Sequence, residues 1–246
     1  MSKALMARLD RLLANLGYGS RKEVQALVTS GKVIIDGKPL KDAGVRIAVD
    51  ATLPERMTIR GAPVDPPAPL VLMMHKPLGV VCSHKEDGEK IYDLLPRRWR
   101  LRDPALSTVG RLDKETSGLI LITDDGDFLH RVISPKRHVP KTYLAKLDRP
   151  LAGAERDIFA AGTMMLDGED KPLLPARLEV VDERTARLTI TEGRYHQVRR
   201  MFAAVGNHVI DLHRERIGGL FLPNNLEPGQ YRILPAAEAE EVFGDA

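Results

Sequence analysis

The 246-residue sequence has one cysteine, few aromatic residues and no long apolar run. Because Cys82 has no second cysteine to pair with, an internal disulfide and a thiolate-rich zinc site are both excluded. No apolar stretch approaches the roughly 20 residues of a membrane-spanning helix, and the first residues lack the apolar core of a signal peptide. The histidines show no metal-ligand spacing. We therefore expect a cytoplasmic protein that uses no metal, no cofactor and no membrane.

Positive charge is concentrated at the start of the chain. Residues 1–47 contain nine lysines and arginines against four acids, a net charge of +5, whereas the whole chain carries only +3. Clustered cations bind polyanions because the phosphates that they neutralise release counterions. A solvated surface without a partner is the alternative that charge alone leaves open. The charge distribution favours an N-terminal module that docks on a polyanion.

The first 40 residues predict two short helices followed by a hairpin. A leucine stripe at helical spacing forms one face of the first helix: Leu9, Leu12, Leu13 and Leu16. Ser20 and Glu23 form a capping-box pattern that begins the second helix, and Asp36-Gly37 is suited to a tight turn. These elements would bury one small core and leave four cations outside it, namely Arg8, Arg11, Arg21 and Lys22.

This succession, RLDRLLANLGYGSRKEVQALVTSGKVIIDGKPL, resembles the S4-type RNA-binding module. The resemblance covers about a fifth of the chain and implies RNA contacts by the cations of the module: Arg8, Arg11, Arg21, Lys22 and Lys32. The same module occurs in proteins of unrelated activity. It therefore predicts RNA binding and says nothing about chemistry.

The domain organisation follows from composition and periodicity. Residues 1–58 form the basic module, residues 59–69 form a proline-rich linker that includes RGAPVDPPAP, and residues 70–246 form the body. The body has strand candidates at residues 70–74, 119–123, 142–147, 178–181 and 186–191. Its helix candidates are residues 126–133, 151–161 and 195–205. Strands and helices in irregular order predict an α+β body and argue against a doubly wound parallel sheet.

One short stretch, Val109 to Asp113, is followed by KETSGLILITDDG and suggests chemistry. A glycine before Arg111-Leu112-Asp113 allows a bulky substrate to approach the backbone closely. An aspartate between apolar segments is costly to keep ionised unless a cation or hydrogen bonds support it. An isolated Arg-x-Asp is nevertheless most often a surface pair. The interpretation of Asp113 therefore depends on the sequence around it.

Three runs closely resemble, in the right order, the motif regions of the pseudouridine synthases: GRLDKETSGLILITDDGDFLHRVISP, KTYLAKL and EGRYHQVRRMFAAVGNHVIDLHRERIGG. The agreement is with the branch that acts on small-subunit ribosomal RNA, in which an S4-type module precedes the catalytic domain. The resemblance covers nearly the whole chain. It implies an α+β fold with a mixed, mostly antiparallel sheet flanked by helices. It also implies isomerisation of a uridine in 16S ribosomal RNA, uridine 516, to pseudouridine.

The resemblance assigns three catalytic residues. Asp113 would be the catalytic carboxylate, Tyr143 would stack beneath the uracil and assist proton removal, and Arg199 would pair with the aspartate. Helical phasing places Arg199 at the flank of an apolar face that contains Val198. The carboxylate would either attack C1′ of the ribose or remove the C2′ proton, and the sequence does not decide between them.

Three further residues lie in these motif regions or before them. Arg111 would grip the RNA backbone around the flipped nucleotide, and Arg200 would meet solvent or phosphate. Family members often have asparagine where His75 precedes Lys76-Pro77, so the role of His75 stays open.

Two other functions compete with this interpretation. A synthase of the same chemistry directed at large-subunit (23S) RNA shares the motifs, and a noncatalytic ribosome-assembly factor shares the S4-type module. Glycosidic hydrolysis is disfavoured because no second carboxylate lies at a motif position to activate water. We expect a monomer whose partner is 16S ribosomal RNA, either free or within an assembling small-subunit particle.

Overall fold

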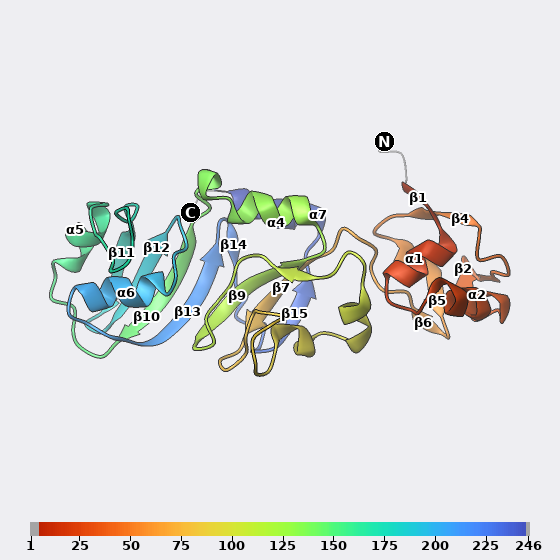
Figure 1. Ribbon diagram of the computed structural model, residues 1–246, viewed down its shortest axis with the longest axis horizontal. Coiled ribbons are helices and arrows are strands. Elements are labelled where there is room, and N and C mark those ends of the chain that lie inside the picture. The colour runs from red at the N-terminus through yellow and green to blue at the C-terminus, as the bar shows by residue number, and fades with distance from the viewer. Residues whose placement is uncertain (1–4, 245–246) are drawn as a thin grey trace. The chain divides into compact units, whose positions relative to one another are not determined.

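The computed structural model describes residues 5–244, which divide into two compact units (Figure 1). The N-terminal unit comprises the chain up to Leu70 together with Leu95–Ser107 and Thr123–Asp125. The C-terminal unit comprises Val71–Leu94, Thr108–Ile122 and the chain from Gly126 onward. Both units contain helices and strands in mixed order, which confirms the predicted α+β class. Within residues 5–244, no helix combines the length and the apolar character needed to cross a membrane.

Short helices and two small sheets form the N-terminal unit. Its elements are β1 (Leu5–Arg8), α1 (Leu9–Asn15), α2 (Arg21–Thr29), β2 (Val33–Ile35), β3 (Lys38–Pro39), β4 (Arg46–Val49), α3 (Leu53–Arg56), β5 (Met57–Ile59), β6 (Ala62–Pro63) and η2 (Arg97–Leu101). Strands β1 and β4 pair with each other, and the second sheet has the order β3-β2-β5-β6. The predicted hairpin turn is confirmed, since Asp36 and Gly37 both have positive φ, 47° and 76°.

The local signals that predicted α1 and α2 are confirmed by their packing. The leucine stripe of α1 is buried in the core of this unit. The Ser20 hydroxyl accepts a hydrogen bond from the Glu23 amide, and the Glu23 carboxylate accepts one from the Ser20 amide, which completes the capping box. The leucine stripe therefore determines which face of α1 packs in the core, and the capping box determines where α2 begins.

The proline-rich stretch from 59 to 69 packs within the N-terminal unit. Val64 is part of its core, and Asp65 receives two hydrogen bonds from the Arg98 guanidinium, at 2.6 and 2.8 Å. The backbone amide of Asp65 donates to the Tyr18 hydroxyl. A second arginine–aspartate ion pair is formed by the buried Arg102, whose Nη2 lies 2.7 Å from Oδ2 of Asp124. Residues 95–107, far along the chain, therefore complete this unit.

A large mixed sheet organises the C-terminal unit. Its strands are β7 (Val71–Lys76), β8 (Ser107–Thr108), β9 (Thr116–Thr123), β10 (Lys141–Leu147), β11 (Arg177–Asp182), β12 (Thr185–Ile190), β13 (Val209–Ile217), β14 (Leu220–Phe221) and β15 (Tyr231–Ile233). The order is β11-β12-β10-β13-β9-β7-β15, with β14 beside β13 and β8 beside β9. Its helices are η1 (Ile91–Leu94), α4 (Gly126–Ile133), η3 (Pro135–Arg137), α5 (Glu155–Ala160), α6 (Gln197–Ala204), α7 (Ala236–Glu240) and η4 (Glu241–Phe243).

The sheet is mostly antiparallel, as predicted, with β13 and β9 running parallel. Strands β7, β9, β10, β11 and β12 confirm the five strand candidates. Strand β13 was not predicted, although it pairs with both β10 and β9 at the centre of the sheet. Helices α4 and α7 lie together on one face (Figure 1), where Phe128, Val132 and Ala239 pack against Leu119 and Leu121 of β9.

Candidate active site

A pocket of about 340 Å³ lies where the ends of several strands meet the start of α6. It is lined by Gly110, Arg111, Leu112, Asp113, Thr116, Tyr143, Ile190, Gly193, Arg194, Tyr195, His196, Gln197, Val198 and Leu212. The volume is within the usual range of ligand sites, about 300–1,000 Å³. The pocket therefore unites Asp113 and Tyr143, which sequence analysis singled out, with the motif that begins α6.

Asp113 lies in the loop that leads into β9, where its carbonyl accepts a hydrogen bond from the Thr116 amide. Its side chain is 34% exposed, so a substrate can reach the carboxylate. The nearest basic atom is Nε2 of His196, 3.4 Å from the carboxylate oxygen Oδ1. Among residues 5–244 no other ion pair of Asp113 is formed, and the expected pair with Arg199 is absent.

Arg199 contacts backbone carbonyls instead of a carboxylate. Its two terminal nitrogens donate to Val209 O at 2.9 Å and to Glu115 O at 2.7 Å. Each carbonyl offers a well-aligned acceptor, so the guanidinium is occupied by two charge-assisted hydrogen bonds. The prediction of a direct pair with Asp113 is therefore corrected. Arg199 connects α6 to the segment that follows Asp113.

A second cation fixes the same segment from inside the sheet. Lys76 on β7 is fully buried, and its Nζ donates to Lys114 O at 3.4 Å and to Thr116 O at 2.9 Å. Burial lowers the pKa of Lys76, while the nearby negative charges, Asp113 included, oppose this effect. Three consecutive carbonyls after Asp113 are thus held by Lys76 and Arg199, which limits the movement of the loop that carries the aspartate.

Tyr143 lies on β10 and is buried to 8% exposure, with its ring on the pocket wall. Its hydroxyl accepts a hydrogen bond from Nη1 of Arg214 at 3.3 Å. Arg214 on β13 also donates through Nε to Leu119 O at 2.8 Å, and its buried Nη2 has no hydrogen-bond partner among the described residues. Arg214 therefore fixes the hydroxyl of the predicted catalytic tyrosine at the expense of one unpaired donor.

Arg214 was not predicted from the sequence, because its position at the pocket follows from the pairing of β13 in the folded sheet. Leu212 and Arg214 alternate on β13 and so share one face, and Leu212 lines the pocket. Gly118 of β9 permits this arrangement, because a Cβ there would collide with the Arg214 carbonyl. The close approach of β9 and β13 at a glycine brings the arginine behind Tyr143.

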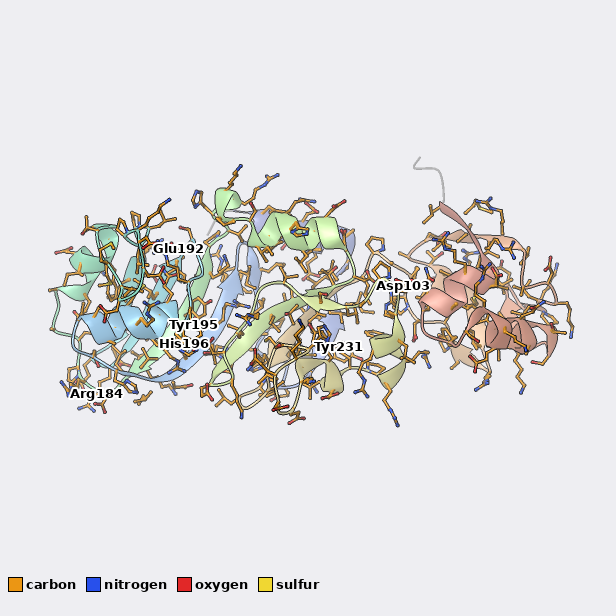
Figure 2. The ribbon with its side chains drawn as sticks, in the orientation of Figure 1. Asp103, Arg184, Glu192, Tyr195, His196 and Tyr231 are labelled. Carbon is orange, nitrogen blue, oxygen red and sulfur yellow. The ribbon has the colours of Figure 1, made fainter. Side chains whose placement is uncertain are left out.

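The start of α6 brings two rings to the pocket. His196, at the N-cap of α6, has a left-handed backbone with φ of 48°, which is uncommon outside glycine. Its ring stacks on that of Tyr195, with centroids 3.9 Å apart and an interplanar angle of 15° (Figure 2). The positive φ that turns the His196 ring toward Asp113 has no signal in the sequence.

The two arginines expected to meet RNA near the pocket differ in their surroundings. Arg111 is 69% exposed and lies 3.6 Å from an oxygen of the exposed Glu86. Arg200 instead forms an ion pair with Glu169 at 3.0 Å and donates to the Tyr195 and Asp167 carbonyls. The expectation that Arg200 meets solvent or phosphate stays a prediction, although an acid and two carbonyls already bind the guanidinium of this 25% exposed side chain.

The cations of the N-terminal module are exposed, as expected. They are Arg8, Arg11, Arg21, Lys22 and Lys32. Arg8 and Arg21 both contact Asp10, at 3.0 and 2.9 Å. The side-chain hydrogen bond from Arg8 lowers the pKa of Asp10 to about 2. Two of the five cations are therefore partly neutralised, whereas Arg11, Lys22 and Lys32 form no ion pair with any described residue.

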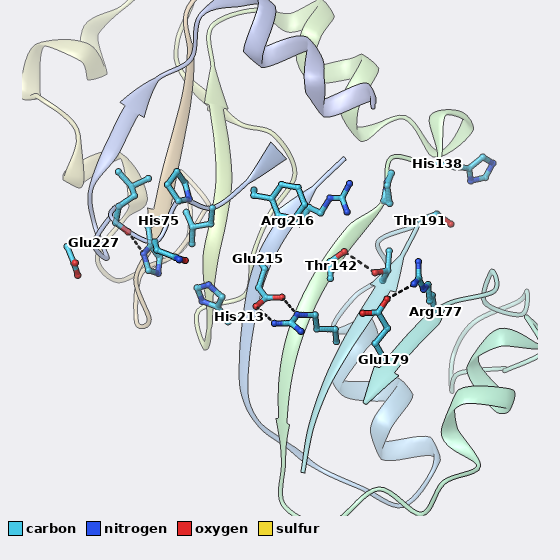
Figure 3. A pocket seen from close by; sticks show the side chains of 18 residues that line it. His75, His138, Thr142, Arg177, Glu179, Thr191, His213, Glu215, Arg216 and Glu227 are labelled. Atoms are coloured by element: carbon cyan, nitrogen blue, oxygen red, sulfur yellow. Dashed lines mark hydrogen bonds and ion pairs between the residues drawn. The ribbon is translucent and has the colours of Figure 1, made fainter. Parts of the chain in front are cut away.

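The reverse face of the sheet contains a larger pocket of about 1040 Å³ (Figure 3). Thr142, Thr189 and His213 line it, while their strand neighbours Tyr143, Ile190 and Leu212 line the first pocket. His75, whose role the sequence left open, lies here, 5.3 Å from the His213 ring and 2.8 Å from Leu226 O. Because its charged groups form pairs such as Arg187–Glu215, at 2.8 Å, this pocket is electrostatically balanced.

No group of three His, Cys, Asp or Glu side chains is arranged to hold a metal ion in the described part of the chain. The first pocket instead combines one accessible carboxylate, an aromatic wall and buried cations behind both. Such a site can stabilise charge on a planar polar ligand and offers a carboxylate as nucleophile or base.

Comparison with known proteins gives concordant results. Residues 70–204 match the RNA pseudouridylate synthase family, and residues 7–53 match the S4 domain. A ribosomal small subunit pseudouridine synthase A from Vibrio cholerae is 42% identical over 96% of this chain and 99% of its own. An uncharacterized RNA pseudouridine synthase from Bacillus subtilis is also 42% identical, over 94% and 96%. The crystal structure of a pseudouridylate synthase matches with a TM-score of 0.67 and 38% identity, over 96% and 99%.

Proposed function

The chain belongs to the RNA pseudouridine synthase family, and from that premise we propose that it isomerises uridine 516 of 16S ribosomal RNA with Asp113 as the catalytic carboxylate. The small-subunit target is supported by the relative from Vibrio cholerae, whose name specifies that subunit. The observation that best supports the role of Asp113 is its accessible carboxylate, held opposite Tyr143 by a loop whose carbonyls are fixed on both sides.

The reaction requires no oxidant and no energy input. The N1–C1′ bond breaks, the base turns, and C5 bonds to C1′; C5 then loses its proton and N1 gains one. Asp113 begins this sequence either by attacking C1′ or by removing the C2′ proton. Uracil in folded RNA cannot reach a pocket, so the nucleotide is flipped out and stacked on a wall. Tyr143 provides that wall, and Arg214 fixes its hydroxyl near the base, where proton removal from C5 takes place.

The RNA is held outside the pocket by exposed cations. Arg111 at the pocket contacts the backbone of the flipped nucleotide. The N-terminal module contacts phosphates elsewhere through Arg8, Arg11, Arg21, Lys22 and Lys32. The protein acts as a monomer on 16S RNA, either free or in an assembling particle.

Replacing Asp113 tests this function. Asp113→Asn is nearly isosteric and removes only charge. We therefore expect pseudouridine formation to be abolished, while the free energy of unfolding and the affinity for RNA stay nearly unchanged. Asp127→Asn is the matched control, because Asp127 is exposed on α4 and does not line the pocket. Pseudouridine is mapped in 16S and 23S RNA after incubation with each variant. Turnover by Asp113→Asn above the no-enzyme background refutes the assignment, and product in 23S RNA alone redirects the target.

A further inference from the structure

One aromatic side chain at the pocket is exposed to an extent that packing does not explain. Tyr195 is 71% exposed, the largest value among the exposed large hydrophobic side chains of residues 5–244, yet it lines the pocket that contains Asp113. His196 covers one face of its ring. An exposed aromatic face beside a functional pocket is typical of a binding surface, since burial of that face would gain free energy.

The backbone that carries Tyr195 is rigidly held. Its carbonyl accepts a hydrogen bond from Arg200 at 3.2 Å. On the other side, Arg194 contacts Glu192 and Glu169, both at 3.1 Å, and donates to the Pro172 carbonyl at 2.7 Å. A ring on a fixed loop needs little ordering when a ligand binds, which favours affinity.

We infer that the stacked Tyr195–His196 pair is a platform for the base next to the target uridine, an inference that rests on the proposed function. Nε2 of the His196 ring that supports Tyr195 is also 3.4 Å from Asp113 Oδ1, so the platform adjoins the reacting group. When a nucleotide is flipped into the pocket, its neighbour loses a stacking partner. Tyr195 replaces that partner.

The chemistry of the pocket entrance fits a nucleobase attached to a phosphate. Stacking on an aromatic ring tolerates every base, because each base has a π face. Arg111, 69% exposed and lining the same pocket, supplies the cation that a neighbouring phosphate requires. An aromatic face combined with an exposed cation is the usual composition of single-stranded RNA sites.

The test uses the full-length protein and a 16S RNA fragment with 2-aminopurine directly 5′ or 3′ of the target uridine. We expect wild-type protein and Tyr195→Phe to quench its fluorescence on binding at one of the two positions. Tyr195→Leu retains bulk against His196 but removes the ring, so it should lose the quenching and raise KM roughly tenfold. The change in kcat should stay within about threefold, because Asp113 and its loop are untouched. Phe221→Leu, an exposed aromatic on the reverse face, is the matched control and should behave as wild type.

Each outcome decides between this inference and the function on which it rests. The platform is refuted if Tyr195→Leu quenches the fluorescence as strongly as the wild type and has an unchanged KM. It is also refuted if Tyr195→Phe loses the quenching and raises KM as Tyr195→Leu is expected to do. A loss of affinity confined to small-subunit particles, with naked RNA bound normally, also overturns it and indicates a protein contact. Quenching by a wild-type protein that forms no pseudouridine refutes the proposed function and leaves the platform standing.

Discussion

Cations cluster in both units of the protein, but in opposite surroundings. In the N-terminal unit, Arg11 and Lys22 are exposed, and Arg8 shares Asp10 with Arg21. In the C-terminal unit, Lys76 and Arg214 are buried on neighbouring parts of the sheet, and neither forms an ion pair with any described residue. The positive charges of the N-terminal cluster therefore lie in water, where the dielectric constant is high, whereas those of Lys76 and Arg214 lie in the protein interior, where it is low.

This contrast assigns different tasks to the two clusters. Exposed cations attract phosphates over distance, but at 0.1 M salt their interactions with charges more than about 10 Å away are largely screened. Buried cations cost free energy to keep charged, but salt hardly screens them and they hold fixed positions. The N-terminal cluster is thus suited to RNA affinity, and the C-terminal cluster to positioning the pocket. Substitutions in each cluster should differ in what they change.

Between the two cation clusters, the largest effect is expected for Arg214→Met in the C-terminal unit. Loss of the guanidinium frees the Tyr143 hydroxyl, and removal of one preorganised donor typically lowers kcat by about 10²-fold. Stability should change by less than about 2 kcal/mol, because removing a buried, unpaired charge offsets the lost bond to Leu119 O. Single-turnover rates and urea unfolding measure both quantities.

A matched variant on the reverse face controls for the loss of an arginine. Arg187 lies on β12, lines the larger pocket and pairs with Glu215. Arg187→Met should leave kcat within about twofold. Equal losses of turnover in Arg187→Met and Arg214→Met would show that the effect does not depend on the position of Arg214 behind Tyr143.

The sequence predicted the elements of the site better than its electrostatics. Apolar periodicity located β9 and α6, and the motifs located Asp113 and Tyr143 on the same pocket. Arg214 was missed because β13, the strand that carries it, was not predicted, so no face could be assigned to this residue. Only the approach of β13 to Gly118, a contact between distant residues, shows that it is buried.

The predicted pair of Arg199 and Asp113 illustrates a second limit. Helical phasing correctly placed Arg199 at the flank of α6, near the loop that carries the aspartate. The phase of a helix does not determine which acceptor a long side chain selects. Carbonyls of Glu115 and Val209, on segments joined only by the tertiary fold, proved to be the partners. The orientation of the His196 ring likewise depends on a positive φ of 48°, which the residue type did not predict.

A second prediction concerns Lys141, a half-buried cation on β10. Burial, reinforced by the charge of Arg214, lowers the pKa of Lys141 from 10.5 to about 8. The unfolded chain therefore retains this proton between pH 8 and pH 10.5, where the folded protein has released it. The cost to stability is fully present below pH 8 and is relieved as the pH rises toward 10.5. Lys141→Met should raise the unfolding free energy at pH 7 by on the order of 1–3 kcal/mol.

The measurement is urea unfolding of wild type and Lys141→Met at pH 7 and pH 9.5. The stabilisation should shrink at the higher pH, and an equal difference at both values would contradict the mechanism. Lys146→Met is the control on the same strand. Lys146 is exposed and pairs with Asp211 at 3.5 Å, so its loss should change stability by less than about 1 kcal/mol.

The smallest effect is expected in the N-terminal cluster, and it should appear in salt dependence. Each phosphate contact contributes roughly 0.7 to 0.9 to the slope of log affinity against log salt. The double variant Arg11→Gln, Lys22→Gln should reduce that slope by about 1.4 to 1.8, while kcat at saturating RNA is unchanged. Arg8→Gln should reduce it less, because Asp10 already neutralises part of that charge. Affinity for 16S RNA across a salt series, by filter binding, provides the slopes. If the double variant kept the wild-type slope, Arg11 and Lys22 would not contact phosphate, and the exposed cluster would lose the task assigned to it.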